Sequence, residues 1–335
     1  MIIFFLEKLR KLFKSIGKLE YGIIDKMVLL DRGAKFENNQ LSFTANNLEN
    51  LKYQINQKKN YPKKLVIVIC FFYNKKKIKT LKKTLNKINS YKFKIDLTLI
   101  TNKISKKERK IIEKLAYPKI KKIDIQENQN LPDDNLLPWY SILVMKKKFE
   151  NKLNSHFMFL EDDILVSNEN ICYWIFFRKI LKKFNLIPGF LRYENYKGNL
   201  YSVDNPKKIF LNKNPKIQNK NNDFGFVNPK YPYSAMYLMD REMMNEYLKS
   251  DATKIDFSFT NRFVKSTFPI KELLNISYAY LNVPKGFHNK LMIPYLKKRI
   301  IPKYCLIEHS EVQYANLNKL KKMGFGKIKI QDLIN

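Results

Sequence analysis

Glycine, cysteine and long apolar runs are scarce in this sequence, and each scarcity excludes a class of protein. The 335 residues include 9 glycines and 3 cysteines, which excludes a collagen repeat and a disulfide-stapled scaffold. No run of 18 or more apolar residues is present, so we expect no transmembrane helix. The sequence also lacks a Walker loop and a GxGxxG motif, so neither fingerprint of nucleotide binding applies.

Negative charge is scarce as well, since 30 acidic residues stand against 64 basic ones, a net charge of +34. Such an excess fits a polyanionic partner, such as nucleic acid, an anionic membrane or a phosphate-bearing substrate. It also fits coding bias, because only 8 of the basic residues are Arg and 56 are Lys. An AT-rich genome produces Lys, Asn and Ile without selection for any partner. The charge alone therefore identifies no partner.

Hydrophobic residues make up 45% of the chain, which is enough for a sizeable core. This content excludes a chain that is disordered throughout. Cys70, Cys172 and Cys305 each lie in an apolar run and form no CxxC or zinc spacing. We therefore expect three buried, inert thiols in a reducing compartment.

The N-terminal segment carries a helical pattern. Apolar residues recur every three or four positions from Phe5 to Leu19, with lysines on the other faces, which predicts a basic amphipathic helix over residues 1–30. Such a helix can lie on an anionic bilayer through residues 1–20, or dock on its own domain or a partner. The apolar start is too short for a signal peptide, so we expect a cytoplasmic protein, peripheral on the inner face of the membrane. Residues 31–62 are polar and aperiodic, as in a linker or irregular arm.

Strands and helices alternate from residue 63 onward. The sequence predicts strands over 65–72, 95–101, 120–125 and 157–160, and helices over 75–88, 105–115, 137–149 and 168–184. This alternation implies right-handed crossovers and an α/β fold with a mostly parallel, Rossmann-like open sheet flanked by helices. Ligands of such sheets bind at the carboxyl ends of the strands. Residues 195–230 show no period and are expected to form a long loop, either a lid or a disordered segment.

Three consecutive carboxylates, Glu161, Asp162 and Asp163, follow the last predicted strand. In a chain of net charge +34, this concentration of negative charge is costly without a neighbouring cation, and carboxylate oxygens suit Mg²⁺ or Mn²⁺. The alternative is a solvated turn whose acids cap the helix that begins at Asn168. The residues alone leave both interpretations open.

The strand followed by Glu161-Asp162-Asp163 resembles the DXD-type motif of GT-A fold glycosyltransferases, especially the EDD of N-acetylglucosaminyltransferase I-like and exostosin-like enzymes. The resemblance implies a GT-A domain over residues 63–335, with a nucleotide-sugar-binding half at 63–165 and an acceptor-binding half at 166–335. It runs from about Leu65 to Leu333 and includes, in order, Tyr73-Asn74, Trp139-Tyr140, Ile187 to Arg192, Tyr233 to Asp240, Val283 to Phe287 and Glu308 to Ser310.

The resemblance further implies a UDP- or GDP-sugar donor whose diphosphate is bridged by Mn²⁺ or Mg²⁺, with the metal stabilising the leaving group. Asp163 is then the direct metal ligand, and Glu161 and Asp162 lie nearer the ribose and the sugar. His309 matches the late histidine that completes the metal site in many such enzymes. Its alternative is a surface or core histidine that binds no metal.

Inverting members of the family use a carboxylate near the start of a later helix as the acceptor base. Glu272 is the first candidate and Asp256 the second, although an acid in a first helical turn also complements the helix dipole. A retaining enzyme would need neither as a base. Asp240 is instead expected to cap a helix over 241–248.

The donor base and ribose should lie at the ends of the first two strands. Tyr73, Asn74 and Asn102 are the candidates there, and the ring of Tyr73 could stack on a base or belong to the core. Arg192 is a candidate for holding the diphosphate.

We therefore expect a metal-dependent glycosyltransferase of polysaccharide biosynthesis, acting on a cell-surface glycan or lipid-linked acceptor. One alternative is a basic nucleic-acid-binding protein or metal-dependent nuclease, although the basic residues are spread along the chain and no binding module is recognisable. Another is a GT-A-like module without catalytic activity.

Overall fold

The structure, a computed structural model, describes most of the chain. It covers residues 40–41, 48–115, 120, 123–128, 134–214, 216–220, 224–229, 235–249, 253, 290–316 and 325–335. The predicted amphipathic helix over residues 1–30 and the candidate bases Glu272 and Asp256 lie outside these described residues. Within them, no helix is both long and apolar enough to cross a membrane.

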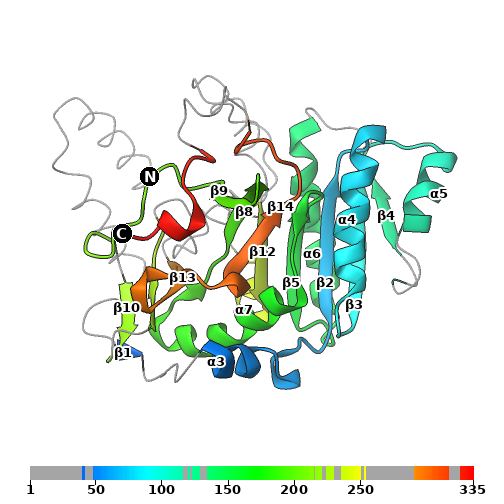
Figure 1. Ribbon diagram of the computed structural model, residues 1–335. Helices are drawn as coiled ribbons and strands as arrows, with labels where there is room; N and C mark the ends of the chain where they lie inside the picture. Colours follow the sequence, from blue (N-terminus) through cyan, green and yellow to red (C-terminus); the bar gives the residue numbers. More distant parts are fainter. Residues whose placement is uncertain are drawn as a thin grey trace, which may run out of the picture.

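A five-stranded sheet in the order β12-β5-β2-β3-β4 forms the right-hand part of the molecule in Figure 1. Its strands are β2 (Leu65–Phe71), β3 (Ile95–Thr101), β4 (Asp124–Glu127), β5 (His156–Glu161) and β12 (Met236–Asp240). The first four run parallel to one another, and β12 runs antiparallel to β5. Every residue of β2 is buried, as expected of an unbroken apolar run in the middle of a parallel sheet. The predicted α/β fold with a mostly parallel sheet is confirmed.

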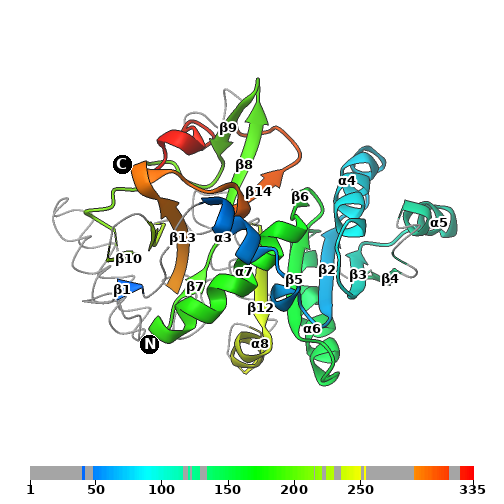
Figure 2. The same cartoon turned by 60° about the horizontal axis from the view of Figure 1, so that its bottom comes forward.

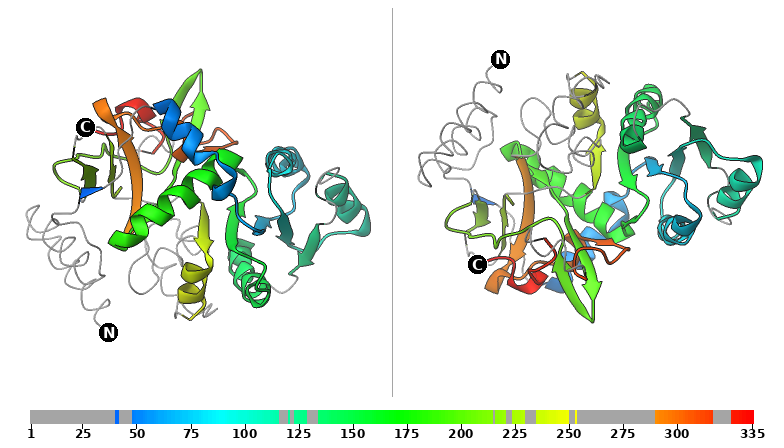
Figure 3. Two further views of the ribbon diagram at one scale, coloured as in Figure 1. Left: turned by 90° about the horizontal axis from the view of Figure 1, so that it is seen from below. Right: turned by 90° about the horizontal axis from the view of Figure 1, so that it is seen from above.

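Helices cover both faces of this sheet. Figure 3 shows α4 and α6 on opposite sides of the strands. The helices are α4 (Ile78–Asn89) after η2 (Lys75–Lys77), α5 (Lys106–Leu115), α6 (Ser141–Glu150) after η3 (Asp134–Tyr140), α7 (Asn168–Leu181) before η4 (Lys182–Phe184), and α8 (Arg241–Leu248). Asp240 caps α8 as predicted, because its side chain accepts the N–H of Met243 at 2.8 Å.

Two further sheets extend the molecule. One has the order β1-β10-β11-β13-β7 and the other β6-β14-β8-β9. In Figures 1 and 2 the sheet that contains β14 lies between the other two. The strands are β1 (Gln40–Leu41), β6 (Ile164–Leu165), β7 (Ile187–Pro188), β8 (Leu191–Tyr196), β9 (Asn199–Ser202), β10 (Lys216–Asn219), β11 (Phe224–Val227), β13 (Leu291–Leu296) and β14 (Leu306–His309). Short 3₁₀ turns η7 (Lys297–Arg299), η8 (Lys303–Cys305) and η9 (Ile330–Asp332) complete the C-terminal part.

The structure corrects two predictions about segments without a period. Residues 195–230, expected to be a loop, contain β9, β10, β11 and the end of β8. These strands are short, and β8 and β11 pair with β14 and β13 from the far end of the chain, so local sequence carries little trace of them. Residues 31–62, expected to be an irregular arm, include α3 (Leu48–Ile55) and η1 (Lys58–Asn60). Helix α3 buries Leu51 and Ile55, four residues apart, and contacts α7.

The three cysteines are buried and have free thiols, as predicted. Burial raises the pKa of Cys172 to about 12 and raises the pKa of Cys70 and Cys305 as well. Thiols in this state are protonated at neutral pH and poorly nucleophilic.

Candidate functional site

The acidic triplet lies at the carboxyl end of β5, beside the carboxyl end of β2. Glu161 is the last residue of β5 and is paired in register with Cys70 of β2. Asp162 and Asp163 form the turn that leads into β6 and are 5% and 8% exposed. They stand at the edge where parallel sheets bind their ligands.

The interpretation of the triplet as helix-capping acids is wrong. Ser167 is the N-cap of α7, and its hydroxyl accepts the N–H of Asn170 at 3.1 Å. The Asn170 side chain in turn accepts the N–H of Ser167 at 2.7 Å. This reciprocal capping box satisfies the first turn of the helix, so the carboxylates of Asp162 and Asp163 are not needed there.

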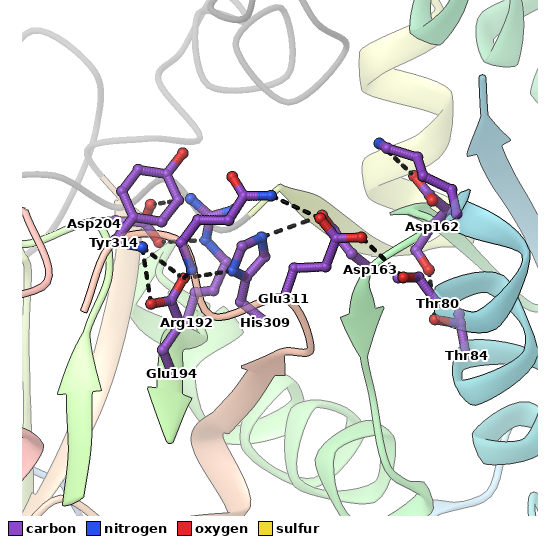
Figure 4. A network of polar contacts seen from close by, with 12 residues as sticks. Thr80, Thr84, Asp162, Asp163, Arg192, Glu194, Asp204, His309, Glu311 and Tyr314 are labelled. Atoms are coloured by element: carbon purple, nitrogen blue, oxygen red, sulfur yellow. Dashed lines mark hydrogen bonds and ion pairs between the residues drawn. The ribbon is translucent and has the colours of Figure 1, made fainter. Parts of the chain in front are cut away.

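His309 reaches the triplet through strand pairing, although it lies 146 residues after Asp163. Strand β14 runs antiparallel to β6 with His309 opposite Ile164, and the N–H of Ser310 donates to the carbonyl oxygen of Asp163 at 2.8 Å. This register places Nε2 of His309 3.1 Å from Oδ2 of Asp163 (Figure 4). The two predicted metal ligands are thus in contact, as a shared site requires, and their ligand role stays a prediction.

Glu194 completes a row of three side chains and was missed from the sequence. It lies in β8, which pairs with β14 in parallel, and its Oε1 is 2.7 Å from Nδ1 of His309. Three backbone N–H groups from the segment after β14 also donate to its carboxylate at 2.7 to 3.1 Å, those of Gln313, Tyr314 and Ala315. Glu194 follows Arg192 at the two-residue spacing of a strand face, which is the signal that could have found it.

The row of Asp163, His309 and Glu194 shifts the pKa of each member. Burial lowers the pKa of His309, but the hydrogen bonds with Asp163 and Glu194 outweigh it and raise that pKa to about 9. Burial raises the pKa of both carboxyls, but other contacts outweigh it and leave both values below their usual range. The contact with His309 acts on both, joined by Arg192 and Lys77 at Asp163 and by backbone N–H groups at Glu194. In Asp162 burial and then repulsion by Asp163 raise the pKa to about 7. The row is therefore an alternation of negative, positive and negative charge.

Two carboxylate oxygens at this edge have an unsatisfied bonding capacity. Within the described part of the chain, Oδ2 of Asp162 and Oδ1 of Asp163 are buried and have no hydrogen-bond partner. Burying such atoms without a partner is costly, and a hard divalent cation would satisfy them. Carboxylate and imidazole ligands together suit Mn²⁺. The residues present therefore fit a divalent metal.

The described residues contain no group of three or more His, Cys, Asp or Glu side chains arranged to hold a metal ion. This agrees with a site completed by its substrate, because Mg²⁺-type cations usually bind through one or two carboxylates plus substrate phosphates.

Helix α4 and the segment after β14 flank the triplet. Nζ of Lys77 is 3.7 Å from Oδ1 of Asp162, and the hydroxyl of Thr84 donates to the carbonyl oxygen of Asp162 at 2.6 Å. The hydroxyl of Thr80 donates to Oε1 of Glu311 at 2.8 Å. Lys77 thus brings a positive charge to Asp162, and Figure 4 shows Glu311 near the triplet, where Thr80 holds it.

The three candidates for contact with a nucleotide lie together at the same edge. Tyr73 and Asn74 follow β2 and Asn102 follows β3, and the N–H of Tyr73 donates to Oδ1 of Asn102 at 2.6 Å. The exposed Asn74 caps η2 by accepting the N–H of Lys76 at 2.9 Å. The half-buried ring of Tyr73 packs edge-on against Phe71. Their contact with a nucleotide stays a prediction.

Arg192, the candidate for holding the diphosphate, forms a buried ion pair with Asp204. Its guanidinium is buried and donates to both oxygens of Asp204, with Nε 3.1 Å from Oδ2 and Nη2 2.6 Å from Oδ1. The guanidinium also lies 5.6 Å from the ring centre of Tyr314. Because breaking a buried ion pair is costly, this contact gives Arg192 a structural role, and its contact with a diphosphate stays a prediction.

Comparison with known proteins assigns no family to this site. No protein-family model matches the chain, and no curated protein matches it. The function is therefore argued from the geometry of the site and the chemistry of its residues.

Proposed function

We propose that the protein is a metal-dependent glycosyltransferase of GT-A type, which transfers a sugar from a nucleotide-sugar donor to a glycan or lipid-linked acceptor. The observation that carries this proposal is the contact between Asp163 and His309 at the carboxyl end of β5. Two side chains so distant in sequence, one in each half of the chain, meet at the edge where an open α/β sheet binds its ligand. The unpartnered oxygens of Asp162 and Asp163 among the described residues add a place for a cation.

Each residue at the site has a separate role in the proposed reaction. Asp163 and His309 would hold Mn²⁺ or Mg²⁺. When bound, the cation supplies positive charge that stabilises the departing diphosphate. Lys77 brings a second positive charge to the same edge, beside Asp162. Tyr73 and Asn102 follow β2 and β3 at the same edge, where the base and ribose of a donor would lie.

The proposal also includes residues that bind or activate the acceptor. The candidate bases Glu272 and Asp256 lie outside the described residues and stay predictions. So do the membrane association through residues 1–20 and the location on the inner face of the membrane.

Donor hydrolysis tests the proposal. The purified full-length chain is incubated with a panel of UDP- and GDP-sugars in Mn²⁺, and release of the nucleoside diphosphate is measured. We expect turnover of at least one donor, loss of turnover in EDTA, and loss in Asp163→Asn. The matched control is Asp332→Asn, which makes the same change at an exposed position and should leave turnover unchanged.

Three results would contradict the proposal. Turnover in EDTA, and turnover of Asp163→Asn, at the rate of the wild type in Mn²⁺ would show that the metal has no part in the reaction. Absence of both turnover and thermal stabilisation by UDP or GDP in Mn²⁺ would favour a module without catalytic activity. Metal-dependent cleavage of DNA or RNA that is lost in Asp163→Asn would favour a nuclease.

A further inference from the structure

We propose that Glu194 is a positioning residue for His309. It holds the Nδ1 proton of the imidazole against its own carboxylate and thereby aims Nε2 at Asp163. This inference rests on the proposed function, because the cation that Asp163 and His309 would share is the one that a nucleotide-sugar donor requires. It assigns a role to a side chain that makes no contact with the acidic triplet itself.

The first argument is the direction of the hydrogen bond between Glu194 and His309. Glu194 is fully buried, and its carboxylate already accepts three backbone N–H groups, from Gln313, Tyr314 and Ala315. An ionised carboxylate is an acceptor only. The Nδ1 atom of His309, at 2.7 Å, must therefore carry the hydrogen and donate it. This leaves Nε2 as the nitrogen on the side of Asp163.

The second argument is that the ring has little freedom to turn. His309 is 4% exposed, and carboxylates lie against both of its nitrogens, at 2.7 Å and 3.1 Å. The ring of Tyr314 packs beside it with 5.7 Å between ring centres. The row is thus ordered before any cation binds, which reduces the entropy lost on binding.

The third argument is the strand register. β14 pairs with β6 on one side and β8 on the other, so the backbone fixes His309 between Asp163 and Glu194. In metal sites, a carboxylate that accepts the second N–H of a histidine ligand fixes the orientation of the ring, and its removal weakens metal binding by about 10- to 100-fold. A purely structural Glu194 would instead only anchor the segment 313–315 to β8.

A double-mutant cycle on Mn²⁺ affinity separates these two roles. Free Mn²⁺ is measured by electron paramagnetic resonance in titrations of the full-length wild type, Glu194→Gln, His309→Ala and the double variant, each with the same concentration of UDP or GDP and compared with the nucleotide alone. We expect Glu194→Gln to weaken binding by about 10- to 100-fold and to have no further effect once His309 is gone. The matched control is Glu308→Gln, in the same strand as His309, which should bind Mn²⁺ as the wild type does. Unchanged affinity in Glu194→Gln, or an equal loss with and without His309, would overturn the inference.

A spectroscopic measurement on the wild type covers the case in which Glu194→Gln does not fold. In the metal-free, histidine-labelled protein, the proton on Nδ1 of His309 should give a downfield, slowly exchanging resonance. Its absence in His309→Ala assigns it to this residue, and the ¹⁵N couplings to the ring hydrogens distinguish Nδ1 from Nε2. Lack of such a resonance would overturn the inference. If the wild type shows the resonance but binds no Mn²⁺ in the presence of UDP or GDP, Glu194 does hold the ring, and it is the proposed function that fails.

Discussion

The buried pair of Arg192 and Asp204 allows a direct test of whether Arg192 stabilises the fold or binds a diphosphate. Replacing Asp204 by Asn keeps the shape of the side chain and removes its charge. If Arg192 is structural, the substitution should destabilise the fold. If Arg192 instead binds a donor diphosphate, the fold should tolerate it.

The magnitude follows from the burial and the geometry of the pair. Arg192 and Asp204 are 5% and 6% exposed, and two hydrogen bonds join them. Burial raises the pKa of Asp204 even though Arg192 opposes the shift, so the charged carboxylate depends on its partner. Removing one member leaves a buried charge without compensation, at a cost of about 3–5 kcal/mol. That is a large part of the roughly 5–15 kcal/mol that stabilises a typical protein.

Urea unfolding followed by tryptophan fluorescence measures this loss, because both tryptophans, Trp139 and Trp174, are buried. We expect the midpoint for Asp204→Asn to fall by about 1 M or more. The exposed Asp332→Asn should change stability by less than about 0.5 kcal/mol. Replacing Arg192 and Asp204 together by Met and Leu should recover much of the loss, since apolar residues of similar volume often substitute for a buried pair. An unchanged midpoint in Asp204→Asn, together with weaker binding of UDP in Mn²⁺, would refute the structural role.

Three further predictions concern other parts of the fold. Burial lowers the pKa of His156 to about 4, so protonation favours the unfolded chain. Stability should be complete above about pH 6.5 and fall towards pH 4 by up to about 3 kcal/mol; denaturation at several pH values should show this slope, and His156→Gln should reduce it. Ser167→Ala removes the cap of α7 and should cost about 1 kcal/mol, measured by the same unfolding assay; no change would mean that the capping box adds nothing. In Gly225→Ala the new Cβ would meet the ring of Tyr295 at 2.5 Å, which should cost about 1–3 kcal/mol; a Tyr295→Leu background should relieve it, and an equal cost there would point to another cause.

Strands β2, β3 and β5 of the five-stranded sheet could be predicted closely because their signals are local. The apolar runs of β2 and β3 are long, and the predicted strands match the observed ones to within one residue. The helix at 241–248 was found from its capping Asp240 for the same reason. The third strand was placed over 120–125, whereas β4 spans Asp124–Glu127, because pairing with the second half of β3 sets where it forms.

Short strands with distant partners could not be predicted in this way. The segment 195–230 has no period, yet it contains the strands β9, β10 and β11, and β11 forms by pairing with the distant β13. Helix α3 was missed because its stripe has only Leu51 and Ile55, and its stability comes from packing on α7. In both cases the stabilising contacts come from residues far away in the sequence, which no local pattern records.

The same division applies to the candidate site. The residue types alone drew attention to the carboxylate triplet and left its role open, and the resemblance to a family motif then selected Asp163 and His309 as candidate ligands. The contact of Asp163 with His309 and the presence of Glu194 beside His309 depend on β14 lying between β6 and β8. The pair of Arg192 and Asp204 depends on the hairpin of β8 and β9. Strand order is a property of the whole chain, since it is set by which apolar faces can be buried together, and only the folded structure reveals it.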